Sequence, residues 1–183
     1  MRNRVVTSRE VQIQNLLDAA LYEPKAKERL KIIPIDSKGF GKAVSDTLLE
    51  TVVALEAQNF NLVQLSPEEV RAAEKKALKV LKPLSIWKNL QVSPNELEAA
   101  VSRKIQAKKF IQFRAKSSVL PVTDSEAQKY FSENRLKFGN LPFENFKENI
   151  KSYLSRANVD RRLKDWYDVL LNKYQVKNLI AEM

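Results

Sequence analysis

Cysteine and histidine are both absent from this chain of 183 residues. Without cysteine there can be no disulfide, no thiolate nucleophile and no cysteine-ligated metal site, and the redox compartment stays undecided. Without histidine the chain lacks the commonest general base and the commonest metal ligand. A zinc site and a Ser–His hydrolase are therefore disfavoured. Asp, Glu, Lys and Tyr remain for acid–base work, but no constellation of them stands out, so we expect no enzymatic activity, no cofactor and no metal.

Glycine is scarce, with 3 residues, and no apolar run approaches the roughly 20 residues that a membrane-spanning helix needs. Hydrophobic residues make up 44% of the chain, which is ordinary for a folded protein. Few glycines together with many Ala, Leu, Lys and Glu favour helix over sheet. We expect a mainly α-helical protein without a membrane span, long enough for one large domain or two small ones.

Acidic residues are fewer than basic ones, 22 against 32, and the formal net charge is +10. The charges are spread along the chain, which favours a well-hydrated surface. The alternative is an anionic partner such as nucleic acid, lipid headgroups or acidic polypeptides. Folded-looking sequence follows Met1-Arg-Asn-Arg directly, so the sequence as written predicts no signal peptide. The protein is then either cytosolic or a mature form with an added initial Met.

The most regular pattern lies in residues 142–180, where no Gly or Pro follows Pro142. Apolar residues recur every three or four positions, which indicates one face of a helix. We predict a helix of roughly eight turns that begins at Pro142, or two helices with a joint near Asn158. It must lie in a groove made by earlier helices, because such a helix is not stable alone in water. Its apolar positions are Phe143, Phe146, Ile150, Tyr153, Leu154, Ala157, Val159, Leu163, Trp166, Leu170 and Tyr174.

Ser, Thr and Pro residues mark the starts of the earlier helices, as helix caps and first-turn prolines do. The second of these helices is strongly apolar and is predicted to be central to the core. Candidate buried positions in the first are Val11, Ile13, Leu16, Leu17, Ala20 and Leu21. The expected helices begin near Thr7, Phe40, Pro67, Pro94 and Thr123, and they end near Pro24, Asn59, Leu81, Pro121 and Phe138.

Two short segments at opposite ends of the chain have strand-like patterns. Val5-Val6 is β-branched, and residues 175–180 alternate polar and apolar side chains. We predict that they pair as a small β-structure, the alternative for Val5-Val6 being a disordered terminus.

Basic residues lie on one face of two predicted helices. Arg71, Lys75, Lys79 and Lys82 are spaced as one helical face, which we interpret as solvated unless the partner is anionic. The next helix carries further basic residues around Phe110 and Phe113, a combination that could bind single-stranded nucleic acid by stacking. At helical spacing such aromatics more often pack a core or line a groove for apolar segments. The basic residues of that helix are Arg103, Lys104, Lys108, Lys109, Arg114 and Lys116.

The order of these signals resembles a known family. The segments are VVTSREV at the start, then LSPEEVRAA, VSPNELEAAV and VLPVTDSEAQKYFSENRLKFG, and finally LPFENFKENIKSYL with RLKDWYDVLLNKYQVKNL. This order resembles the chaperone part of SurA-type parvulin proteins, which are bacterial periplasmic folding factors for outer-membrane proteins. The resemblance covers nearly the whole chain and is strongest from Val92 to Asn178.

The resemblance implies one helical chaperone domain over residues 1–183. Helices of residues 1–141 and the long helix and strand of 142–183 would pack together, with the terminal segments paired. In that family parvulin isomerase domains are inserted before the closing helix, whereas this chain has only Gly139-Asn140-Leu141-Pro142 there. Parvulin active sites normally use histidine, which is absent. The resemblance therefore implies a periplasmic client-binding domain without isomerase activity, and no catalytic residue is carried over.

Three hypotheses follow. The first is a holdase that buries apolar segments of unfolded outer-membrane proteins in a helical groove. The second is a basic helical nucleic-acid-binding protein, disfavoured because acidic residues are interspersed and no motif is found. The third is an enzyme.

The sequence leaves open whether the protein forms a homodimer by exchanging its long helix. Near a helix break, the peptide-binding candidates are Ile86, Trp87, Leu90, Phe110 and Phe113, with packing in the core as the alternative for each.

Overall fold

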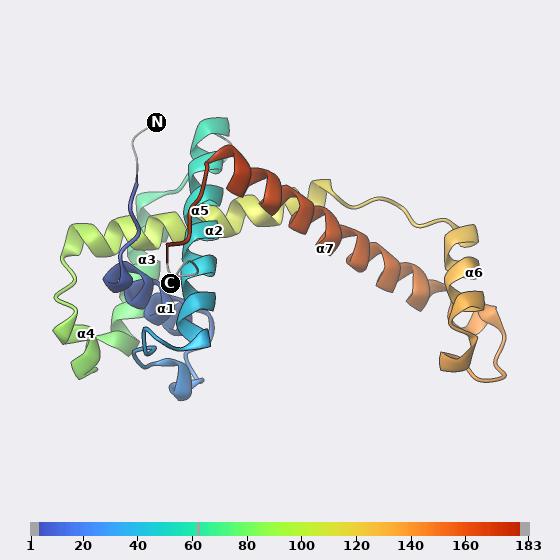
Figure 1. Cartoon of the computed structure of the whole chain (residues 1–183), viewed down its shortest axis with the longest axis horizontal. Coiled ribbons are helices and arrows are strands. Elements are labelled where there is room, and N and C mark those ends of the chain that lie inside the picture. Colours follow the sequence, from blue (N-terminus) through green and yellow to red (C-terminus); the bar gives the residue numbers. More distant parts are fainter. Residues whose placement is uncertain (1–3, 62, 180–183) are drawn as a thin grey trace. The chain divides into compact units, whose positions relative to one another are not determined.

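The computed structural model describes residues 4–61 and 63–179, and it is mainly α-helical, as predicted (Figure 1). The helices are separated by short 3-10 turns and irregular segments, and no strand forms in the described ranges. The seven α-helices are α1 (Ser8–Tyr22), α2 (Lys38–Phe60), α3 (Pro67–Leu81), α4 (Ser85–Asn89), α5 (Pro94–Ser117), α6 (Asp124–Glu133) and α7 (Lys147–Lys173). The 3-10 turns are η1 (Lys27–Arg29), η2 (Arg135–Lys137) and η3 (Phe143–Asn145).

Helix starts follow the capping residues of the sequence. The Thr7 hydroxyl accepts a hydrogen bond from the backbone N–H of Glu10 at 3.2 Å, and Ser66 caps α3 in the same way. Thr123 and Glu126 form a full capping box at the start of α6. These side chains satisfy backbone N–H groups that the first turn of a helix leaves unpaired, which is why the predicted starts of α1, α3 and α6 are confirmed.

The chain divides into two compact units. Unit 1 contains the residues up to Phe110 together with those from Leu170 onward, and unit 2 contains Ile111–Val169. The boundaries therefore fall inside α5 and α7. The single domain expected over residues 1–183 stays a prediction, because two compact units can still unfold together.

In unit 1 the most completely buried helix is α1, which packs against α2 and α3. All six of its predicted core positions are buried. Two glutamines of α1 are buried as well, and the Gln12 amide bonds the backbone N–H and C=O of Ile33 at 3.0 and 2.7 Å. The expected central helix, α2, is buried over a smaller part of its length, because Leu48, Leu49 and Leu55 are only half-buried.

Unit 2 has a small core of aromatic rings. Phe131 lies at its centre, with ring centroids 4.9 Å from Phe138, 5.5 Å from Phe143 and 6.3 Å from Phe146. Ile150 of α7 is buried against the same cluster. The α6 helix is shorter than predicted, since it ends at Glu133 and is followed by η2 and by Gly139, whose φ of 58° suits glycine.

The long helix α7 differs from the prediction at its start. It begins at Lys147, because η3 occupies the first turn after Pro142, and it runs through Asn158 without the joint that we considered. Along α7, side chains from 151 to 169 are exposed or half-buried, and only Ile150 and Leu170 are buried.

The predicted β-pairing of the termini is not shown. Val5 and Val6 are irregular, and so are residues 176–179, while Ile180 lies outside the described residues. The backbone N–H of Val176 instead donates to Leu171 O at 3.0 Å, and that of Gln175 to Asn172 O at 3.1 Å. With Gln175 at a φ of 50°, these bonds form a Schellman motif that ends α7. The N–H that a strand would need at Val176 is therefore already used.

The end of α7 is fixed to α2 within unit 1 by Glu56. This buried carboxylate accepts hydrogen bonds from Lys173 Nζ at 2.7 Å and from the Tyr174 hydroxyl at 2.7 Å. Asn59 Nδ2 donates to the same hydroxyl at 2.8 Å. Burial and the neighbouring Glu56 carboxylate raise the pKa of Tyr174 to about 12.

We expect Tyr174→Phe to lower the free energy of unfolding by about 1 kcal/mol at neutral pH, because two hydrogen bonds are lost. The folded-state pKa lies above the ordinary value of 10. The contribution of the phenol is therefore complete below pH 10 and is lost as the pH rises towards 12. Urea unfolding at several pH values checks this, with Tyr153→Phe as control. A difference between wild type and Tyr174→Phe that stays constant above pH 10 would contradict it.

Candidate functional site

Three of the predicted peptide-binding residues belong to the core of unit 1. Trp87 is 7% exposed and packs with Leu17, Leu81 and Val101 in one buried cluster. Ile86 and Leu90 are half-buried against the same cluster. The chain leaves the helical conformation after α3, and the short helix α4 then packs against this core. Their role as client contacts stays a prediction, and the burial of Trp87 favours the core alternative.

The other two predicted residues lie one turn apart on α5 but in different units. Phe110 is 2% exposed, and its ring stacks on Phe60 with centroids 6.2 Å apart. Phe60, which the sequence reasoning missed, is 58% exposed. Phe113 belongs to unit 2 and is 47% exposed. The structure therefore does not gather the five candidates into one site, and Phe113 is the one that is largely accessible.

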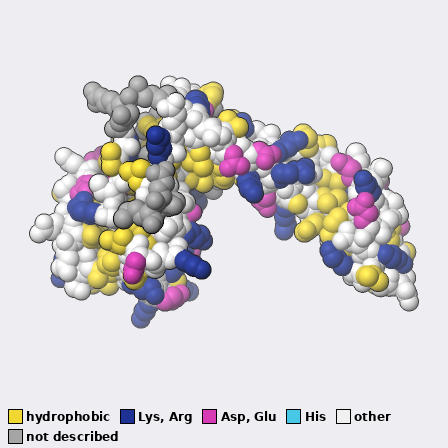
Figure 2. Space-filling view, viewed as in Figure 1, with side chains coloured by type: hydrophobic (Ala, Val, Ile, Leu, Met, Phe, Trp, Pro, Cys, Tyr) yellow, Lys and Arg dark blue, Asp and Glu magenta, His cyan; other side chains and the backbone are white. Residues whose placement is uncertain are grey.

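Exposed apolar side chains are concentrated in unit 2. Although this unit is less than a third of the chain, it holds seven of the thirteen large hydrophobic side chains that the structure shows as exposed among the described residues. Leu136 on η2 is fully exposed. Figure 2 shows hydrophobic side chains at the molecular surface, interspersed with basic ones. The seven are Phe113, Val119, Leu120, Leu136, Leu141, Tyr153 and Val169.

A hollow of about 360 Å³ in unit 2 lies beside the segment that connects α5 to α6. Residues 119–122 of this segment form one wall, and α7 forms the other with Lys151, Ser152, Ser155 and Arg156. Val119 and Leu120 are exposed, while Val122 is buried. Pro121 disfavours the helical region of the backbone for Leu120, the residue before it. We call residues 119–122 and these four α7 residues the linker groove.

The two basic side chains of the linker groove, Lys151 and Arg156, differ in whether they have an acidic partner. Asp124 at the start of α6 pairs with Lys147 at 2.6 Å and with Lys151 at 2.8 Å, and these two ammonium groups lower its pKa to about 2. Arg156 makes no ion pair with a carboxylate of the described residues. The charge of Lys151 is thus offset by a neighbour, whereas that of Arg156 faces solvent.

Sequence reasoning missed the linker groove because it predicted that the helix beginning near Pro94 continues to about Pro121, which places Val119 and Leu120 in the helix. The structure ends α5 at Ser117. Pro121 was the available signal, since a proline disfavours the helical conformation for the residue before it and so indicates that the helix ends earlier.

Most basic residues of α5 are engaged within the protein. Arg103 pairs with Glu10 at 2.8 Å, and Lys109 pairs with Glu69 at 2.6 Å. The Lys108 ammonium lies 3.7 Å from the centre of the Tyr22 ring, and in unit 2 the Arg114 guanidinium lies 5.2 Å from that of Trp166. These contacts leave little of the expected basic face of α5 for nucleic acid. By contrast, the α3 face is exposed at Arg71, Lys75, Lys79 and Lys82.

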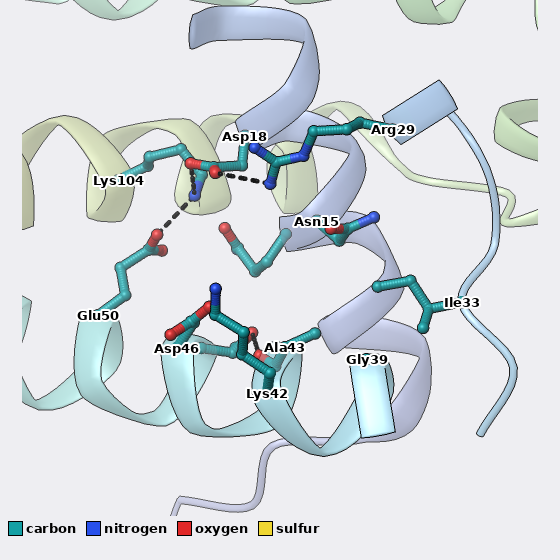
Figure 3. A pocket seen from close by; sticks show the side chains of 12 residues that line it. Asn15, Asp18, Arg29, Ile33, Gly39, Lys42, Ala43, Asp46, Glu50 and Lys104 are labelled. Carbon is teal, nitrogen blue, oxygen red and sulfur yellow. Dashed lines mark hydrogen bonds and ion pairs between the residues drawn. The ribbon is translucent and has the colours of Figure 1, made fainter. Parts of the chain in front are cut away.

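A second hollow, of about 290 Å³, lies in unit 1 between α1 and α2 (Figure 3). Its charged lining consists of three carboxylates and three basic side chains. Lys104 is buried, and its ammonium donates to Glu50 at 2.6 Å and to Asp18 at 3.3 Å. Arg29 lies 3.7 Å from the other oxygen of Asp18. The buried Lys104 is thus paired with a carboxylate of α1 and one of α2, which indicates that this network holds α1, α2 and α5 together.

The comparisons with known proteins give no assignment. The sequence matches no protein-family model and no curated protein, and the structure matches no solved structure. The described residues contain no group of three or more Asp or Glu side chains placed to hold a metal ion. None of the helices in the described part of the chain is long and apolar enough to cross a membrane.

We expect Trp87→Ala to lower the free energy of unfolding by about 3 kcal/mol, because a large side chain leaves a cavity in the core. Differential scanning calorimetry should show a melting temperature lower by about 10 °C. Phe113→Ala is the matched aromatic control and should cost much less, since Phe113 is half exposed. Weaker client binding by Trp87→Ala without loss of stability would instead place Trp87 in a binding groove.

Removing the buried ammonium of Lys104 should also destabilise the protein. Lys104→Ala leaves Glu50 without its closest cation in a poorly solvated position, and we expect a loss of about 3 kcal/mol in urea unfolding. Lys75→Ala on the exposed face of α3 should stay within about 0.5 kcal/mol of wild type. Equal stability of the two variants would show that the network contributes nothing.

Proposed function

We propose that this protein is a holdase-type chaperone that binds unfolded segments of outer-membrane or secreted proteins in the bacterial periplasm. The observation that supports this most is the concentration of exposed apolar side chains in unit 2. Soluble proteins seldom expose much contiguous apolar surface, and where they do, it commonly marks an interaction site. A client segment that covers these side chains removes apolar area from water, which stabilises the complex without requiring one particular sequence.

Binding of a client to these side chains is expected to be reversible. Covering apolar area contributes roughly 25 cal/mol per Å², and ordering an unfolded client opposes it, so the net affinity is moderate. Basic side chains such as Arg156 attract acidic clients and raise the rate of encounter. A client held in this way is released when it finds its folded state or another partner.

The periplasmic setting and the class of client rest on the resemblance to SurA-type proteins. The supporting feature is the order of the helix starts, of which α1, α3 and α6 begin at the capping residues that the sequence indicates. We propose further that the protein is a binding protein and not an enzyme, and in particular that it has no isomerase activity. The absence of histidine from the sequence supports this, because parvulin-type active sites normally contain it.

A labelled, unfolded outer-membrane-protein segment should bind saturably in fluorescence anisotropy at physiological salt. The affinity should survive a rise in salt, because apolar burial is not screened by ions. Leu136→Ser combined with Leu141→Ser should weaken binding by about tenfold, an estimate that takes about 1.4 kcal/mol for the two buried side chains together. The melting temperature should not change, since both side chains are exposed.

Leu179→Ser is the matched control, because Leu179 is an exposed leucine of unit 1. It should leave the affinity unchanged. Absence of binding by wild type, or binding abolished by modest salt, would overturn the chaperone proposal.

A second candidate is binding to nucleic acid, favoured by the exposed face of α3. Its three lysines, Lys75, Lys79 and Lys82, make no ion pair with any described carboxylate. Replacing all three with glutamine should then weaken binding to an oligonucleotide and flatten the dependence of log K on log salt. An unchanged slope would remove this candidate.

A further inference from the structure

The lining of the linker groove contains cations and hydroxyl groups but no carboxylate. Arg156 is exposed and forms no ion pair with a described carboxylate. The side-chain hydroxyls of Ser152 and Ser155 form no hydrogen bond with any residue that the structure describes. The hollow of unit 1 differs in this respect, because three carboxylates belong to its lining. The polar wall of the linker groove is therefore suited to an anion.

The donors on this wall lie close together on α7. Ser152, Ser155 and Arg156 are three and four residues apart, which makes them neighbours on the surface of a helix, and all three line the same hollow. Lys151 adds a second cation, although Asp124 offsets its charge. A carboxylate has about four acceptor positions, enough for one guanidinium and two hydroxyl groups. Its hydrogen bonds to Arg156 would also be charge-assisted, and such bonds are stronger than neutral ones.

The opposite wall of the hollow is apolar. Val119 is 55% exposed and Leu120 is 49% exposed, and Pro121 lies between Leu120 and the buried Val122. A small inorganic anion would leave this wall in contact with water. A ligand that brings an apolar group next to its carboxylate would cover it and gain from the burial of apolar area. The two walls together thus favour a carboxylate with an adjacent apolar group.

We propose that the linker groove binds the C-terminal residue of an unfolded client. The α-carboxylate contacts Arg156 and the two serine hydroxyls, and an apolar side chain on the same Cα packs against Val119 and Leu120. Capture of a C-terminal carboxylate is an established mode of peptide recognition. An internal Asp or Glu fits less well, because its own side chain ends in the charge and the chain must leave the hollow in two directions. This inference rests on the proposed chaperone function, and it adds which part of the client this groove binds.

A free C-terminus occurs once in each client chain. The groove therefore binds one position of a client, whereas the other exposed apolar side chains of unit 2 contact any apolar segment without regard to its position. The two kinds of contact on one client raise the overall affinity, because the second contact forms within an existing complex.

The test compares two versions of the labelled outer-membrane-protein segment. Both carry the fluorophore at the amino end and finish in leucine, one with a free carboxylate and the other with a carboxamide. We expect the carboxylate version to bind to the full chain about fivefold more tightly in fluorescence anisotropy at physiological salt, the size of one charge-assisted contact at a partly exposed site. This preference should shrink as salt is added, since exposed charges are screened.

Substitutions on the two walls test the two contacts separately. Arg156→Gln should weaken binding of the carboxylate version about fivefold and leave that of the carboxamide version unchanged. Arg161→Gln is the matched control, because Arg161 is an exposed arginine of α7 outside the lining of the hollow, and it should keep the preference. Leu120→Ser should weaken binding of both versions but not of a segment that ends in serine. Melting temperatures verify that each variant folds.

The outcomes separate this inference from the proposed function. If wild type binds both versions equally, or if Arg156→Gln keeps the preference for the carboxylate, the inference is overturned and the chaperone proposal stands. If wild type binds neither version, both fail. If sedimentation shows that wild type self-associates and Arg156→Gln does not, a second copy is the occupant, and the client assignment is overturned.

Discussion

The buried Glu56 joins α2 to the last turn of α7 within unit 1. Its carboxylate, on α2, receives the last turn of α7 through Lys173 and Tyr174, while Leu170 is buried beside them in unit 1. Residues 111–169 form unit 2, whose two ends both lie within continuous helices. The core of unit 2 is little more than the aromatic cluster around Phe131, and seven large apolar side chains remain exposed in this unit.

Charge is used differently in the two units. In unit 1 the basic side chains of α5 are paired with carboxylates of α1, α2 and α3, where they hold helices together. In unit 2 Asp124 is exposed and its partners Lys147 and Lys151 are half-buried, while Arg156 makes no ion pair with a described carboxylate. The 32 basic residues therefore overstate the number of cations free to contact nucleic acid, because several are paired with carboxylates within unit 1.

Local signals predicted the helices well, since caps and prolines act within one turn of the residues that carry them. The apolar spacing of α1 identified its six core positions for the same reason. Predictions that depend on tertiary partners were weaker. The sequence around Trp87 does not determine whether the residues at the helix break pack against a core or line an open groove. The alternation of residues 175–180 indicated a strand, but the Schellman motif at Gln175 used the N–H of Val176 first.

Pro121 also bears on aggregation, since an unpaired strand edge can recruit further chains without limit. The segment that follows α5 offers few backbone donors, because Pro121 has no N–H and that of Val119 is bonded to Lys116. Although Val119 and Leu120 are exposed and apolar, the segment is therefore a poor template for pairing with another chain.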